Sequence, residues 1–198
     1  ERDRLAKAVF RELVDREELR FFLVRGCAGN VVPERITVRG TRRLTTDVGE
    51  PIQQSLFDTV VEDDFNTVER AVALYLDHHE WILTWYRNMV RSGYSIQGWH
   101  KDRIYPDFVA MSNQGTEDSE QVPRIEQVYV LETKGLHLKN EDTAYKQEVF
   151  ELCNTLSEPT PWDVIEDEFS NHRVQFQVIF EDEWQRVLNA MLTANNDC

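Results

Sequence analysis

Tyr105-Pro106-Asp107-Phe108 and Leu131-Glu132-Thr133-Lys134-Gly135 are the two stretches that decide the fold. Their composition predicts two strands, over residues 104–111 and 124–134. Side chains alternate between the faces of a strand, so Glu132 and Lys134 project from the same side, roughly 7 Å apart. Asp107 lies on a strand that can pair beside them. Two carboxylates and one ammonium would then converge on one spot, which can hold a hard divalent cation and an attacking water.

The same three charges have a second interpretation, a cross-strand salt bridge, which is common on exposed strands. The apolar run over residues 128–131 indicates instead a central strand that is buried on both faces. A buried charge is costly unless it is paired or bound to a metal. The sequence therefore favours catalysis by Asp107, Glu132 and Lys134 over a purely structural role.

The sequence of these stretches resembles the motif of the PD-(D/E)xK nucleases, with Pro106-Asp107 as its first part and Glu132-x-Lys134 as its second. YPDF followed by LETKG resembles the C-terminal endonuclease domain of type III restriction enzymes (the Res subunit) and related helicase-nucleases. The resemblance extends over ERAVALYLDHHEWILTWYRN and AYKQEVFEL and covers about residues 60–180. It implies an α/β fold with a restriction-endonuclease-like core, a central mixed β-sheet flanked by α-helices.

The resemblance also implies a metal-dependent endodeoxyribonuclease with Mg²⁺, or alternatively Mn²⁺, as its cofactor. Asp107, Glu132 and the backbone carbonyl of Thr133 would be the metal ligands. Lys134 would orient or deprotonate the water, or stabilise the phosphate.

Further site residues follow from the same resemblance. Glu69 matches a helix glutamate that often reaches the metal site, but it also stands three residues after Asn66, where a capping glutamate is expected. Arg87, within WYRN, is a candidate phosphate contact or the partner of a buried carboxylate. Tyr145 and Lys146 lie on a helix that often supplies a polar residue to the active centre, and we take them as candidate substrate contacts.

Apolar periodicity and turn residues predict the remaining elements. We expect helices over residues 3–18, 66–77 and 142–154, a terminal helix opening at 181–183, and strands over 21–24, 36–38, 94–99 and 174–180. Residues 81–90 fit a strand or a second helix. The resulting order from residue 66, helix–strand–strand–strand–helix–strand, is the one that the nuclease core requires.

The charge is unevenly distributed. Residues 1–50 carry 11 basic and 9 acidic side chains, whereas residues 51–198 carry 11 and 27, for a net charge of −14 over the chain. We expect residues 1–50 to be an N-terminal appendage or linker from an upstream helicase region and residues 51–198 to be the endonuclease domain. The first residue is Glu1 rather than Met, which predicts that the chain is part of a longer protein or has been processed.

The acidic balance predicts weak DNA binding by this chain alone, because phosphate binding needs a basic surface. The resemblance implies an upstream helicase or ATPase domain or subunit that delivers the chain to DNA, and a methyltransferase or other DNA-recognition subunit. The three cysteines form no CxxC pair, and no apolar run reaches the length of a membrane helix. We therefore expect a cytoplasmic protein without a membrane partner.

The sequence thus predicts a Mg²⁺-dependent DNA endonuclease domain, a hydrolase of phosphodiester bonds in a restriction or antiviral defence helicase-nuclease. The alternative is an inactive nuclease fold that serves as a DNA-binding or assembly module of a helicase. The presence of all three motif residues counts against that alternative.

Overall fold

The computed structural model describes residues 1–16, 18, 36–38, 40–91, 93–113, 127–138, 140–156 and 173–193. The chain forms two compact units: unit 1 comprises residues 1–35 and 88–106, and unit 2 comprises residues 36–87 and 107–198. Residues 36–50 thus group with unit 2. These units do not coincide with the expected division at residue 50, which stays a prediction about the larger protein.

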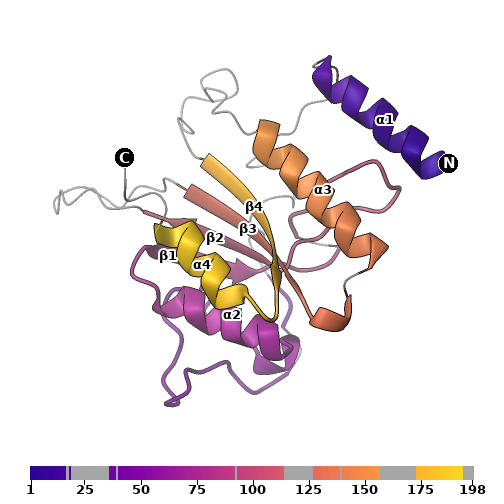
Figure 1. Ribbon diagram of the computed structural model, residues 1–198. Coiled ribbons are helices and arrows are strands. Elements are labelled where there is room, and N and C mark those ends of the chain that lie inside the picture. The colour runs from indigo at the N-terminus through magenta and orange to yellow at the C-terminus, as the bar shows by residue number, and fades with distance from the viewer. Residues whose placement is uncertain are drawn as a thin grey trace. The chain divides into compact units, whose positions relative to one another are not determined.

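Unit 2 is an α/β structure in which helices cover both faces of a four-stranded mixed sheet (Figure 1). Its elements are η1 (Glu62–Asp64), α2 (Thr67–His78), β1 (Ile82–Arg87), β2 (Phe108–Ser112), β3 (Gln127–Lys134), η2 (Leu136–Leu138), α3 (Glu141–Leu156), β4 (Arg173–Phe180) and α4 (Trp184–Thr193). The strand order is β1-β2-β3-β4. The pairs β1–β2 and β2–β3 are antiparallel, while β3 and β4 are parallel and joined through α3. From residue 66 the elements follow the order helix–strand–strand–strand–helix–strand, with β1 in the place of the strand expected over residues 94–99.

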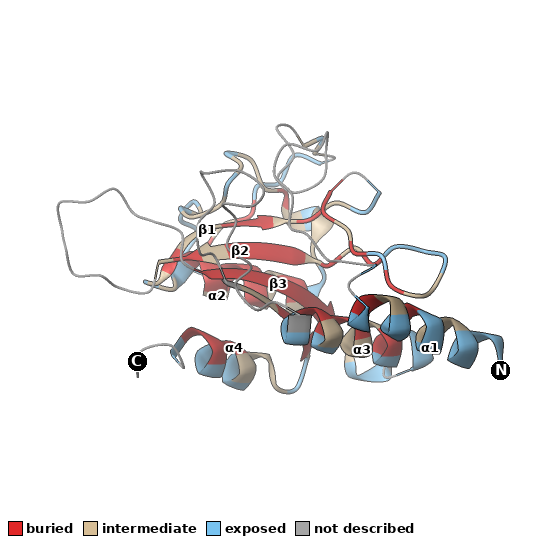
Figure 2. Ribbon diagram, turned by 90° about the horizontal axis from the view of Figure 1, so that it is seen from above, coloured by how far each residue is buried: buried red, intermediate tan, exposed pale blue. Residues whose placement is uncertain are grey.

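The core explains why the sheet has helices on both faces. Alternate residues of the strands pack with α2 and α4 into one apolar cluster, whose members include Leu76, Trp85, Phe108, Leu131, Ile179 and Leu188. The side chains on the other face of β4 pack against α3. The rings of Phe150 and Phe176 lie 5.5 Å apart, and the Asn154 side chain hydrogen-bonds to the N–H and the carbonyl of Phe176. The central strands are buried along their length, whereas the helices keep exposed outer faces (Figure 2). β3 is accordingly a central strand, as its apolar run predicts.

Local hydrogen bonds fix where two of the helices begin. Asn66 and Glu69 form the expected capping box at α2: Asn66 Oδ1 accepts from the Glu69 N–H at 2.9 Å, and Glu69 Oε2 accepts from the Asn66 N–H at 3.1 Å. α3 starts earlier than expected, because Asn140 rather than Asp142 provides the cap. The Thr143 N–H donates to Asn140 Oδ1 at 3.1 Å.

A buried carboxylate, Asp77, ties a loop to the sheet. It accepts from the backbone N–H groups of Gln53 and Gln54 and from Nε1 of Trp85. The loop in turn bonds to β1: the Leu56 N–H donates to the Trp85 carbonyl at 2.8 Å, and the Trp85 N–H donates to the Gln54 carbonyl at 3.0 Å. We call this arrangement the Asp77 clamp. It holds residues 53–56 along β1.

Unit 1 contains α1 (Arg2–Asp15), close to the helix expected over residues 3–18. Phe10 on its buried face packs edge-on against Trp99, with ring centroids 5.8 Å apart. The strand expected over residues 94–99 is wrong, since only an isolated bridge joins Ile96 to Ile104. Asn88 takes the place of a strand partner, because its side-chain amide bonds to both the N–H and the carbonyl of Tyr94.

The remaining expectations for secondary structure have mixed outcomes. Residues 81–90 contain a strand, β1, rather than a helix. Residues 36–38 form no strand in the structure, and the expected strand over residues 21–24 lies outside the described residues. Among the described helices, none is long and apolar enough to cross a bilayer.

Candidate active site

Asp107 lies beside Glu132 at one end of the sheet. β2 begins at Phe108, so Asp107 stands just before the strand and not within a strand over residues 104–111 as expected. Its N–H still donates to the Leu131 carbonyl at 2.9 Å. The β2–β3 register ends with Phe108 opposite Leu131. Asp107 therefore lies next to the end of this strand pair, where the charge of Glu132 acts on it.

The Asp107 carboxylate is held by Thr133. Its Oδ2 atom accepts from the Thr133 N–H at 2.7 Å and from the Thr133 hydroxyl at 2.8 Å. The pKa of Asp107 is nevertheless raised from 3.8 to about 7, first by burial and then by the charges of Glu132 and Glu69, while the two hydrogen bonds from Thr133 lower it. Asp107 thus lies beside two other carboxylates, and a bound cation would favour its ionised form.

Glu132 is 2% exposed, and its two oxygens have different surroundings. Oε1 contacts two ammonium groups, with Lys134 Nζ at 2.6 Å and Lys146 Nζ at 2.8 Å. Oε2 is buried and has no hydrogen-bond partner among the residues that the structure describes. A buried carboxylate oxygen without a partner is unfavourable unless another group, such as a metal ion or water, contacts it. The expected proximity of Glu132 and Lys134 is confirmed.

Helix α3 brings Lys146 to Glu132. Burial by itself would lower the pKa of Lys146, but the charge of Glu132, the hydrogen bond to it and the charge of Asp142 together raise it above the ordinary value. Asp142 Oδ2 lies 3.4 Å from Lys146 Nζ, one helical turn earlier. Tyr145, the neighbouring candidate, is buried. The structure therefore brings Lys146 to the site, and places Tyr145 in the interior.

Glu69 and Arg87 form a second charged pair next to this site. Arg87 Nη2 lies 2.8 Å from Glu69 Oε2, the oxygen that also completes the capping box. The structural alternatives are thus confirmed for both residues: Glu69 caps α2, and Arg87 neutralises a buried carboxylate. Glu69 reaches the site through its charge, which contributes to the raised pKa of Asp107. Its role as a metal ligand stays a prediction.

The donor groups fit a cation that retains much of its water. Asp107 and Glu132 supply two neighbouring carboxylates, and the unpartnered Oε2 of Glu132 is a ready oxygen ligand. No group of three or more His, Cys, Asp or Glu that could hold a metal occurs within the described residues. Mg²⁺ is commonly bound through one or two carboxylates while keeping several waters. The Thr133 carbonyl stays a predicted ligand, whereas its N–H and hydroxyl bind Asp107.

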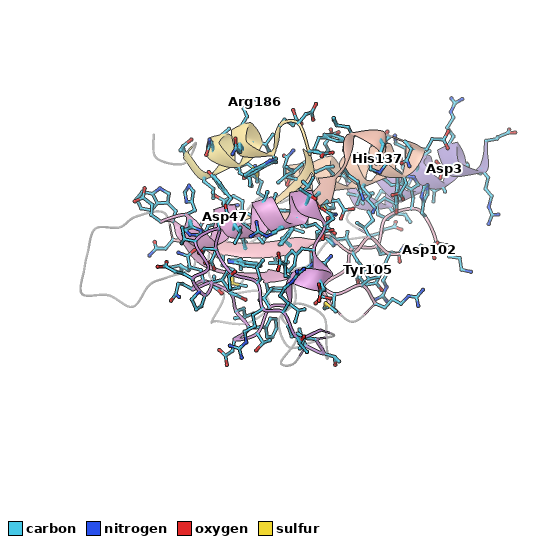
Figure 3. The ribbon with its side chains drawn as sticks, turned by 90° about the horizontal axis from the view of Figure 1, so that it is seen from below. Asp3, Asp47, Asp102, Tyr105, His137 and Arg186 are labelled. Atoms are coloured by element: carbon cyan, nitrogen blue, oxygen red, sulfur yellow. The ribbon has the colours of Figure 1, made fainter. Side chains whose placement is uncertain are left out.

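Two features of the site lay beyond the sequence reasoning. The Thr133 side chain is a partner of Asp107, for which the sequence gives no signal. The ion pair between Asp142 and Lys146 follows their spacing of four residues on a helix, which could have indicated it. His137 comes from η2 (Figure 3). Its ring packs on Gly135, where an added Cβ would lie 2.9 Å from Cε1 of the ring.

Comparisons with known proteins identify no relative. No family model matches the chain, and neither a curated protein nor a solved structure shows significant similarity to it.

Proposed function

We propose that unit 2 is a Mg²⁺-dependent DNA endonuclease domain with a restriction-endonuclease-like core. One observation carries the proposal: Asp107 lies beside Glu132 at the end of two paired strands, and one buried oxygen of Glu132 has no partner among the described residues. That oxygen is available to a bound cation or water. The element order from α2 to β4 and the mixed sheet support the same core.

The chemistry follows from the side chains present. Mg²⁺, held by Asp107 and Glu132, supplies Lewis acidity and neutralises negative charge on a phosphodiester. Lys134 points toward the same carboxylate, with its ammonium 2.6 Å from Glu132 Oε1. From there it donates a hydrogen bond to a phosphate oxygen or orients the attacking water. Thr133 fixes the Asp107 carboxylate through two hydrogen bonds, so Asp107 keeps one oxygen, Oδ1, for other ligands.

The charge of the chain bears on how it reaches DNA. A net charge of −14 opposes binding to a polyanion. The proposed function therefore includes an upstream helicase or ATPase, and in a type III restriction or antiviral defence system a methyltransferase or other recognition subunit, that brings the site to DNA. The proposed cytoplasmic location is consistent with such a role.

A cleavage assay tests the proposal. Supercoiled plasmid is incubated at low ionic strength with the chain and with Mg²⁺, Mn²⁺ or EDTA. Wild type should nick or linearise the plasmid only with a divalent cation, and Asp107→Asn and Lys134→Met should not. Asp47→Asn is the matched control, because it removes a carboxylate charge at a position that is 82% exposed and paired with Arg70.

Weak DNA binding is separated from absent chemistry by a second protein, in which a sequence-specific DNA-binding domain is fused to the N-terminus. The fusion should cut near its recognition sequence. The proposal fails if the fusion binds that sequence and leaves it intact with Mg²⁺ and with Mn²⁺. It fails equally if Asp107→Asn cuts as well as wild type.

One observation favours a second candidate, a non-catalytic binding or assembly module. Glu132 Oε1 is already contacted by two lysines, so the protein itself balances the charge of this carboxylate. In such a module the cluster would be structural, and the acidic surface would bind a basic partner. The fusion experiment separates the two candidates, since the module would bind DNA through its partner domain without cutting.

A further inference from the structure

More positive charge surrounds Glu132 than is needed to neutralise its carboxylate. Two ammonium groups, of Lys134 and Lys146, share its Oε1 atom at 2.6 and 2.8 Å, while Oε2 has no partner. One ammonium is enough to neutralise one carboxylate. A divalent cation that binds Glu132 therefore meets a second positive charge within a few ångströms, in an interior where charges interact strongly.

Lys146 also contacts a second carboxylate, that of Asp142. Lys146 belongs to α3, and its Nζ lies 3.4 Å from Oδ2 of Asp142, which stands four residues earlier on the same helix. The Asp142 side chain is 62% exposed, whereas that of Glu132 is 2% exposed. Lys146 thus contacts a buried and an exposed carboxylate at the same time, and a small rotation of its side chain would leave Glu132 while keeping Asp142 as a partner.

We propose that Lys146 is a positioning residue that occupies Glu132 while the site is free of metal and turns to Asp142 when a divalent cation binds. The inference rests on the proposed function, because it requires Glu132 to be a cation ligand. In the cation-free protein Lys146 holds the Glu132 carboxylate in place. It thereby weakens cation binding, since the cation must first displace it, and Asp142 favours the displacement.

Substitutions at Lys146 and at Asp142 should change the affinity for Mn²⁺ in opposite directions. Calorimetric titration of the full chain with Mn²⁺ measures this affinity. Lys146→Met keeps the length of the side chain and removes the competing charge, so it should bind Mn²⁺ about tenfold more tightly than wild type. Asp142→Asn removes the alternative partner, so it should bind several-fold more weakly. A lysine that only stabilises the fold would produce no such pair of opposite shifts.

Thermal unfolding supplies a second readout. In EDTA, Lys146→Met should unfold at a lower temperature than wild type, because Glu132 loses one of its two ammonium partners. Saturating Mn²⁺ should remove this difference, because the metal takes over the role of the lysine. The inference is overturned if Lys146→Met melts below wild type by the same amount with and without Mn²⁺, or if its Mn²⁺ affinity equals or falls below that of wild type.

The same titration separates failure of the inference from failure of the proposed function. If wild type binds Mn²⁺, Asp107→Asn does not, and Lys146→Met binds no better than wild type, only the role of Lys146 is refuted. If wild type does not bind and Lys146→Met does, the competition is supported. If neither binds, both the metal site and the competition at it are refuted.

Discussion

Replacing Asp107 by asparagine should stabilise the metal-free protein, and the gain should grow with pH. Burial and neighbouring carboxylates raise the pKa of Asp107 from 3.8 to about 7 in the folded chain. Between these two values the folded state binds a proton that the unfolded state has lost, so the free energy of unfolding falls as the pH rises. The full penalty at pH 8 is on the order of 4 kcal/mol.

Asp107→Asn removes this penalty and keeps an oxygen that accepts from Thr133. Urea unfolding in EDTA should therefore show that the variant is more stable than wild type by about 1–2 kcal/mol at pH 5 and by about 4 kcal/mol at pH 8. Asp47→Asn, at an exposed carboxylate, is the control and should show no such growth. A gain for Asp107→Asn that is the same at both pH values would refute the reasoning.

In saturating Mn²⁺ the order of stability should reverse, so that wild type is more stable than Asp107→Asn. A cation bound by Asp107 and Glu132 stabilises the ionised carboxylate, so wild type should gain stability at pH 8 by mass action and the variant should not. Below pH 7 the binding should release about one proton, because the cation displaces it from Asp107. Titrations in two buffers of different ionisation enthalpy measure that proton.

Three further predictions concern the frame around the site. Thr133→Val removes the hydroxyl that donates to Asp107 at 2.8 Å, so the pKa of Asp107 should rise by about one more unit, as followed by carbon NMR of its carboxyl group. Asn66→Ala breaks the capping box and should cost about 1 kcal/mol of stability in urea, whereas Asn66→Asp should retain most of it. Asp77→Ala leaves buried donors of the loop and of Trp85 without an acceptor and should cost about 3 kcal/mol or more in the same assay.

The sequence predicts those parts of the site that depend on short spacings. Glu132 and Lys134 are two residues apart on one strand, and alternation alone puts them on the same face. Asn66 and Glu69 are three residues apart at a helix start, where the capping box is a local structure. The central position of β3 follows from its apolar run, since a strand covered on both faces has no exposed side.

Contacts between distant elements could not be predicted in this way. Fourteen residues separate Lys146 from Glu132, and their contact depends on how α3 docks on the sheet. Thr133 points to Asp107 only because β2 begins one residue after the aspartate. Asn88 prevents a regular strand at Tyr94 by binding its backbone groups. In each case the packing of the elements determines which contact forms, and the sequence alone does not distinguish that contact from others.

The Asp77 clamp has a consequence for self-association. β1 is an outer strand of the sheet, and residues 53–56 bond to its backbone at Trp85. An uncovered outer strand is a template on which another molecule can add a strand, which is how many folded proteins begin to aggregate. The buried Asp77 carboxylate anchors the covering segment through two backbone N–H groups of the loop, in addition to the two hydrogen bonds between the segment and Trp85. Loss of the clamp would therefore expose an edge for intermolecular pairing before the rest of the sheet unfolds, and the first sign of damage would be turbidity rather than a change in helix content.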